Sequence, residues 1–254
     1  MGLTLTWLSV IILIPLAGLF LKTLELSPGQ FWEILTSRRT LNALKLSFGL
    51  SFAAACVNLV MGTIIVWALV RYRFPGRRLF DAIVDIPFAL PTAVAGVALT
   101  QLFAVKGWLG GPLAELGIKV AFTPIGIFIA MVFIGIPFVV RTVQPVLIDL
   151  DGEIEEAAAS LGASRWHTVF RVILPSLIPA LLTGFALAFA RAVGEYGSVI
   201  FIAGNLPNVS EIAPLLIVIR LSEFRYADAT AIAVVMLVAS FLVIFAVSFV
   251  GGAR

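Results

Sequence analysis

Long apolar stretches alternate with short polar or glycine-rich stretches along the whole chain. A helix needs about 20 mostly apolar residues to cross the hydrocarbon core of a bilayer. Six apolar stretches come close to or exceed that length, at about residues 4–22, 42–70, 79–105, 123–148, 177–203 and 227–250. The pattern therefore predicts an all-α membrane protein with six transmembrane helices, forming a single domain over residues 1–254.

Composition supports a membrane protein and argues against a nucleic-acid partner. Of the 254 residues, 61% are hydrophobic and 12% are charged, whereas soluble domains carry about 25% charged residues. The net charge of +3 arises from basic residues that cluster in short loops, as they do beside membrane spans. Residues 1–6 lack Lys and Arg and no A-x-A-like cleavage site follows, so we expect a retained first helix rather than a signal peptide.

The distribution of basic residues predicts the orientation. Four arginines lie within eight residues, at Arg71, Arg73, Arg77 and Arg78, and such clusters favour the cytoplasmic side. A second basic group, which includes Arg38 and Arg39, lies near the loop that would then face outside. Because the loop at residues 71–78 is much shorter than the loop near Arg38 and Arg39, we expect the loop at 71–78 to be cytoplasmic. Six spans then place both termini and the connection at residues 149–176 in the cytoplasm.

This fourth connection contains "EEAAASLGASRWHTVFRVILP", which predicts helix, turn and helix. Acidic residues at its start favour a helix N-terminus, three alanines leave little bulk, and Gly162 permits a sharp turn. Apolar residues then recur at helical spacing at Trp166, Val169, Phe170 and Ile173. The alternative is an amphipathic helix lying on lipid headgroups, which the acidic run suits poorly because the inner leaflet is negative.

Prolines and charges inside the spans are the remaining candidates. The pairs Pro87/Pro91 and Pro137/Pro145 either kink helices for packing or break them along a transport pathway. Arg191 and Glu195 are four residues apart, so they form either a self-contained pair or a pair that tunes an anion pathway. The other predicted pathway residues are Ser198 and Asp85, and Asp85 has the alternative of an ordinary position near the cytoplasmic end with Asp81.

The sequence offers little for an enzyme. It contains no G-x-x-x-x-G-K-[ST] phosphate loop. One histidine, His167, and one cysteine, Cys56, do not make a zinc site or a catalytic dyad with a second imidazole. We therefore expect no catalytic, metal or cofactor site on this chain.

The fourth connection resembles the EAA loop of ATP-binding-cassette (ABC) importer permeases. The matching positions are Glu156, Ala157, Ala158, Gly162, Val172 where the family has Ile, Leu174 and Pro175. The stretches "RYRFPGRRLFDAIVDIPFALPTAVAG", "FVVRTVQPVL" and "ALAFARAVGEYGSVIFIAGN" resemble sulfate/thiosulfate permeases. These importers pair two permease types, and "GEYGSVIFIAGN" resembles one type more than the other, which usually reads closer to G-E-F-G-A-V.

The resemblance implies a type I ABC importer permease fold, with a cytoplasmic coupling helix between helices four and five that docks on an ATPase. Carried over to this sequence, the coupling residues are Glu156, Ala157, Ala158 and Gly162, with Leu161, Ala163 and Ser164 beside them. The implied partners are an ATPase dimer that binds ATP and Mg²⁺, a second permease subunit or second copy, and a periplasmic binding protein for sulfate or thiosulfate. The implied location is the bacterial inner membrane. A molybdate or tungstate permease and, less well matched, a secondary anion carrier are the alternatives.

Overall fold

The structure is a computed structural model that describes residues 2–150 and 152–252. All regular secondary structure in these residues is helical, as predicted. The helices are α1 (Gly2–Leu8), α2 (Ile14–Thr23), α3 (Pro28–Thr36), α4 (Arg38–Arg71), α5 (Arg77–Val84), α6 (Ile86–Ala89), α7 (Thr92–Phe103), α8 (Gly110–Glu115), α9 (Pro124–Asp149), α10 (Gly152–Ser160), α11 (Arg165–Thr168), α12 (Leu174–Val193), α13 (Val199–Ile202), α14 (Ala213–Ser222) and α15 (Tyr226–Gly252). Two π-helical turns, Ser9–Leu13 and Val169–Ile173, join α1 to α2 and α11 to α12.

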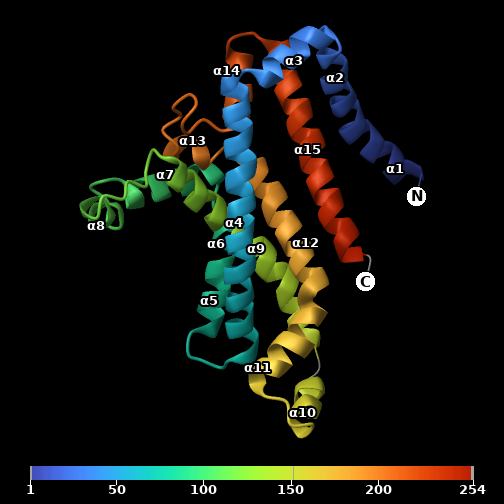
Figure 1. Ribbon diagram of the computed structural model, residues 1–254, viewed down its shortest axis with the longest axis vertical. Coiled ribbons are helices and arrows are strands. Elements are labelled where there is room, and N and C mark those ends of the chain that lie inside the picture. Colours follow the sequence, from blue (N-terminus) through green and yellow to red (C-terminus); the bar gives the residue numbers. More distant parts are fainter. Residues whose placement is uncertain (1, 151, 253–254) are drawn as a thin grey trace.

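Three long helices, α4, α9 and α12, pack against one another and form the core of the bundle. Val139 and Val143 of α9 are fully buried there, and Phe185 and Phe189 of α12 stack with ring centroids 6.4 Å apart. α15 packs on the outside of α12 and also contacts α2, α3 and α14. The buried apolar residues form two clusters, one around α4, α9 and α12 and the other where α9 meets α13, and helices α2 and α15 lie on one flank of the bundle (Figure 1).

Five helical segments are long and apolar enough to cross a membrane: Thr6–Thr23, Arg38–Arg71, Pro124–Asp149, Arg165–Val193 and Tyr226–Val247. They correspond to five of the six predicted spans. The third predicted span, residues 79–105, is wrong as a single helix, because it consists of α5, α6 and α7. Leu90 is extended, with φ −86° and ψ 134°, which is the conformation that a following proline imposes, and Pro91 is the N-cap residue that precedes α7.

The fifth predicted span, 177–203, has the wrong limits. Its helix begins at Arg165 and ends at Val193. Pro175 lies within this longer helical rod, in the first turn of α12 and directly after the π-helical turn Val169–Ile173. A proline in a first helical turn is tolerated, because the backbone donor that it lacks is least needed there. The chain after Val193 turns and forms only the short helix α13 before the loop to α14.

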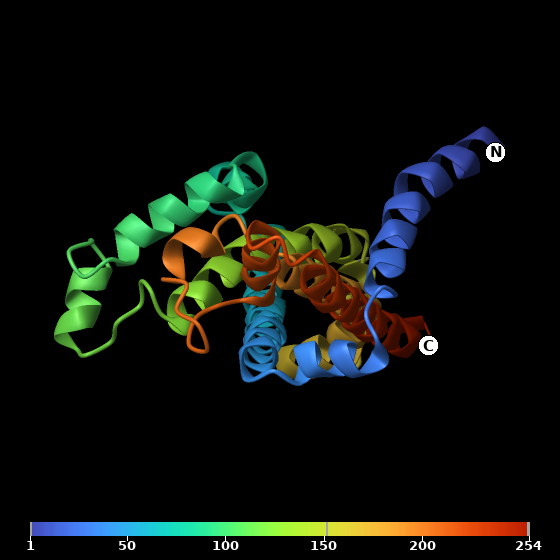
Figure 2. The same cartoon turned by 90° about the horizontal axis from the view of Figure 1, so that it is seen from above.

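The molecule has two distinct ends (Figure 1). α3 and α14 lie at one end, whereas α5, α10 and α11 lie at the other, and the described ends of α1 and α15 point away from α3 (Figure 1). Seen from above, α7 and α8 extend to one side of the bundle and α1 stands away from it on the other (Figure 2). The broken third segment and the first helix therefore form the periphery of the bundle.

Candidate coupling and pathway sites

The predicted helix–turn–helix is present between α9 and α12. We call residues 152–168, that is α10, the turn and α11, the elbow. At the end of α10 the amide of Ala163 donates to the carbonyl of Ala158 at 3.0 Å, which is the six-to-one hydrogen bond of a Schellman motif. Gly162 has φ +82°, in the left-handed region that favours glycine. The elbow predicted at Gly162 is therefore present, and its geometry depends on this residue.

The second half of the elbow begins at Ser164. Its backbone is extended, with φ −68° and ψ 157°, and its hydroxyl accepts a hydrogen bond from the His167 amide at 3.3 Å. This is an N-cap, which satisfies one of the free amides at the start of α11. From Arg165 the helix continues through the π-helical turn into α12, so the elbow lies at the end of a rod that reaches Val193.

Most of the predicted coupling residues are exposed. Among the seven, the exposed ones are Glu156, Ala157, Leu161, Gly162 and Ser164, and the half-buried ones are Ala158 and Ala163. The side chain of Leu161 at the tip is 88% exposed. The tip of the elbow therefore carries an uncovered apolar side chain among small residues.

The apolar stripe predicted after the turn divides into two parts. Ile173 is buried and Val169 is half-buried, so these two face the bundle. Trp166 and Phe170 are exposed and stack on each other with ring centroids 5.8 Å apart. The exposed part lies next to the elbow.

Three of the four predicted pathway residues lie together where α12 ends. Arg191 and Glu195 form an ion pair. The second carboxylate oxygen of Glu195, Oε1, accepts hydrogen bonds from the amide and hydroxyl of Ser198, at 2.8 Å and 2.9 Å. Glu195 and Ser198 are buried, whereas the Arg191 side chain keeps 33% of its surface exposed. Glu195 lies in the turn after α12 rather than in the middle of a span, which corrects its predicted position.

The fourth, Asp85, lies elsewhere, between α5 and α6. Arg141 of α9 donates to both of its carboxylate oxygens, at 2.8 Å and 2.7 Å, and donates to the Asp81 carboxylate at 2.7 Å. Gln144 also accepts from Arg141. Asp85 is therefore paired in a network with Asp81 and Arg141 that joins α5 to α9.

Sequence reasoning did not select two residues that form strong pairs. Arg141 is one, although a charge inside the predicted span 123–148 was a detectable signal. Glu211 is the other: it is 2% exposed and accepts two hydrogen bonds from Arg39, at 2.7 Å and 2.6 Å. Its signal was weak, because it lies in a polar loop whose burial the sequence does not reveal.

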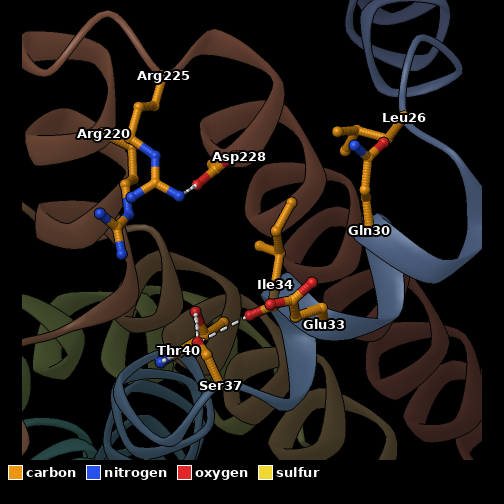
Figure 3. Close-up of a pocket in the computed structure, with 9 residues that line it drawn as sticks. All are labelled: Leu26, Gln30, Glu33, Ile34, Ser37, Thr40, Arg220, Arg225 and Asp228. Carbon is orange, nitrogen blue, oxygen red and sulfur yellow. Dashed lines mark hydrogen bonds and ion pairs between the residues drawn. The ribbon is translucent and has the colours of Figure 1, made fainter.

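A cavity of about 310 Å³ lies among α3, α4, α14 and α15 (Figure 3), at the end of the molecule where α3 and α14 lie (Figure 1). Its lining residues are Leu26, Gln30, Glu33, Ile34, Ser37, Thr40, Arg220, Arg225 and Asp228. Its two arginines are paired, Arg225 with Asp228 and Arg220 with Glu223 at 2.8 Å. The hydrogen bond from Arg220 lowers the pKa of the exposed Glu223 carboxyl. With its charges internally balanced, the cavity does not favour a free anion.

Residues 58–253 match the family model of the binding-protein-dependent transport system inner membrane component. The chain belongs to this permease family. It is 49% identical to the "Sulfate transport system permease protein CysT" of Escherichia coli over 248 residues, covering 98% of this chain and 90% of the relative. It is 51% identical to the protein of the same name from Synechococcus elongatus over 245 residues, covering 96% and 88%.

Both relatives are named CysT, the T-type sulfate permease that the stretch "GEYGSVIFIAGN" resembles more than the other type. The predicted resemblance to sulfate permeases is therefore confirmed. They are named as permease proteins, and this chain is accordingly a transport subunit rather than an enzyme.

Two solved structures share the fold of this permease. A chain of a bacterial ABC transporter involved in the import of the acidic polysaccharide alginate superposes with a TM-score of 0.80 at 16% identity, covering 98% of this chain and 92% of that one. The alginate transporter in complex with an alginate pentasaccharide-bound periplasmic protein gives 0.78 at 17% identity, covering 96% and 89%. These likenesses confirm the predicted ABC importer permease fold.

Proposed function

We propose that this permease is the membrane-spanning subunit of an ATP-driven importer that translocates sulfate and thiosulfate. The observation that supports it most is that nearly the whole chain aligns, with about half of its residues identical, to proteins named as sulfate transport permeases. Sulfate and thiosulfate are the substrates that the resemblance implied, and a periplasmic binding protein delivers them. The alginate transporter that shares the fold is in complex with a periplasmic protein that carries alginate pentasaccharide, which supports delivery by a periplasmic protein here.

In this proposal the elbow is the docking site for a cytoplasmic ATPase. Glu156 and Leu161 present charge and apolar surface, Ala157 and Ala158 permit close packing, and Gly162 shapes the turn that Ala163 and Ser164 complete. ATP and Mg²⁺ bind to the ATPase dimer, and this chain holds no cofactor. Because the elbow continues into the rod Arg165–Val193, movement of the docked ATPase shifts the membrane helices, which biases the equilibrium between inward-open and outward-open states.

The proposal also includes the arrangement in the membrane. α5, α6 and α7 together make the third of six membrane crossings. Both termini and the loop 149–176 face the cytoplasm of a bacterial cell. A second permease subunit or a second copy completes the pathway. Arg191, screened by Glu195, tunes the electrostatic potential along that pathway, and Ser198 holds the Glu195 carboxylate in place. Asp85 contributes by its pairing with Arg141, close to the cytoplasmic end.

The first test of the substrate is uptake of radiolabelled sulfate by cells with and without this chain. We expect deletion to abolish uptake, and we expect thiosulfate to compete in cells that carry the chain. If sulfate uptake persists and molybdate or tungstate uptake is lost, the substrate assignment is wrong. Uptake that continues without ATPase subunits would instead support a secondary anion carrier.

The elbow is tested by two substitutions of Gly162. Valine is strained at φ +82°, whereas asparagine tolerates the left-handed region. We expect Gly162→Val to reduce co-purification of the ATPase and sulfate uptake, without loss of the membrane domain, and Gly162→Asn to keep both close to normal. Normal ATPase co-purification with Gly162→Val would contradict the role of the elbow.

A further inference from the structure

One ion pair joins the elbow to the membrane bundle. Arg71 is the last residue of α4, and its Nη2 atom lies 2.6 Å from Oε1 of Glu155 in α10. The side chains keep 22% and 33% of their surface exposed, but the two contacting atoms are shielded from solvent. The contact is an ion pair rather than a hydrogen bond, and among the described residues neither atom, nor the buried Nε of Arg71, has a hydrogen-bond partner. Each of the two shielded charges therefore depends on the other for compensation.

α10 has few other attachments. Within residues 152–252 and 2–150, its main packing partner is α11, across the turn, and the pair with Arg71 is the one described side-chain polar contact that reaches the bundle. A short helix held at its end by a glycine turn can rotate unless a second contact fixes it. The Arg71–Glu155 pair supplies this second contact.

Fixing Glu155 also determines which way its neighbour points. Successive residues of an α-helix are about 100° apart around the axis, given 3.6 residues per turn. With Glu155 half-buried against α4, Glu156 is turned out to the exposed surface, as is Ala157. Arg71 in addition neutralises Glu155, so that among the described side chains of α10 Glu156 carries an exposed, unpaired negative charge.

We propose that Arg71 is a positioning residue of the coupling site, which holds α10 in the orientation that docks on the ATPase. This inference rests on the proposed coupling function. In this inference Arg71, at the start of the basic turn after α4, does more than help to orient the protein in the membrane. By holding Glu155 it sets the orientation of α10 for docking.

The test uses charge reversal in the complete transporter, purified and reconstituted with its ATPase. We expect Arg71→Glu and Glu155→Arg each to weaken the apparent affinity for the ATPase about tenfold, the effect of losing roughly 1.4 kcal/mol. The double variant, Arg71→Glu with Glu155→Arg, restores the pair and should return the affinity to within about twofold of normal. Arg78→Glu is the matched control, because it makes the same charge change at an exposed residue of the same turn.

Titration with ATPase subunit separates positioning from folding. A docking defect is overcome by mass action, so excess ATPase should restore the maximal uptake rate of Arg71→Glu, with an unchanged KM for substrate. If charge reversal prevents accumulation of the protein, Arg71→Gln and Glu155→Gln are titrated in the same way, and we expect the same direction of change.

The outcomes distinguish this inference from the proposed function. Normal ATPase affinity of the Arg71 variants, or a double variant as weak as either single, would overturn the positioning role. If Gly162→Val lowers ATPase affinity in the same assay, coupling through the elbow stands and only the role of Arg71 falls. If Gly162→Val also binds normally, the elbow is not the docking site and both proposals fail.

Discussion

Among the described side chains, Arg141 of α9 makes the most hydrogen bonds. Its guanidinium bonds both oxygens of Asp85, the side chain and carbonyl of Asp81, and the amide oxygen of Gln144. Two carboxylates so close together repel each other unless a cation lies between them. Arg141 therefore holds the first part of the broken third segment against α9.

We expect Arg141→Ala to destabilise the purified permease by about 1–3 kcal/mol. This value lies between those for exposed and for buried ion pairs, because the side chains of Arg141, Asp81 and Asp85 are 31–48% exposed. The measurement is the thermal unfolding midpoint in detergent. Lys22→Ala is the control, because Lys22 (43% exposed) forms one local ion pair, with Glu25 three residues away (58% exposed), whereas Arg141 joins two helices, so the loss of Lys22 should change little. Equal effects of the two substitutions would mean that Arg141 does not hold α5.

Sequence distance explains which pairs could be predicted. Arg191 and Glu195 were found because they are four residues apart, so helical geometry alone brings them together. Asp85 is 56 residues from Arg141, and Arg39 is 172 residues from Glu211. Such pairs depend on how helices pack. Local sequence also sufficed for Gly162, since a glycine after a helix predicts a left-handed turn. It did not suffice for the Arg71–Glu155 pair, whose members are far apart in the sequence.

At the scale of the elements, hydropathy located the apolar segments but not their interruptions. An average over many residues cannot show that residues 79–105 contain three helices, although Pro87 and Pro91 marked where breaks could occur. The last helix of the broken segment, α7, lies close against the backbone of the turn that follows α12. A Cβ atom on Gly96 of α7 would lie 2.4 Å from the carbonyl oxygen of Ser198 and 2.7 Å from its Cα.

Gly96→Ala should therefore destabilise the permease, because backbone atoms of the Glu195–Ser198 turn cannot move aside as a flexible side chain would. We expect a loss of about 1–3 kcal/mol, as for overpacked cores, and displacement of Arg191 with the turn. Gly49→Ala in α4 makes the same chemical change where no atom lies within 4 Å, so it should be neutral or stabilising by up to about 1 kcal/mol. Thermal unfolding of both variants checks the opposite signs.

At the scale of the whole molecule, the proposals require its two ends to face different compartments. The Arg71–Glu155 pair places the basic turn and the elbow on the same side of the bundle, and α14 with the loop before it lies on the other (Figure 1). Charge density favours a cytoplasmic basic turn. An ATPase could then reach the elbow, and a periplasmic protein could reach the loop before α14.

Cysteine accessibility tests this arrangement directly, since Cys56 is the one cysteine of the chain. In a Cys56→Ala background, we expect a membrane-impermeant maleimide to label Pro207→Cys in intact spheroplasts, and to label Arg78→Cys only after permeabilisation. Both positions are exposed in the structure, and the background without added cysteine serves as the control. Labelling of Arg78→Cys in intact spheroplasts would place the elbow outside. No cytoplasmic ATPase could then dock there, and the coupling role of Gly162 and the positioning role of Arg71 would both be excluded.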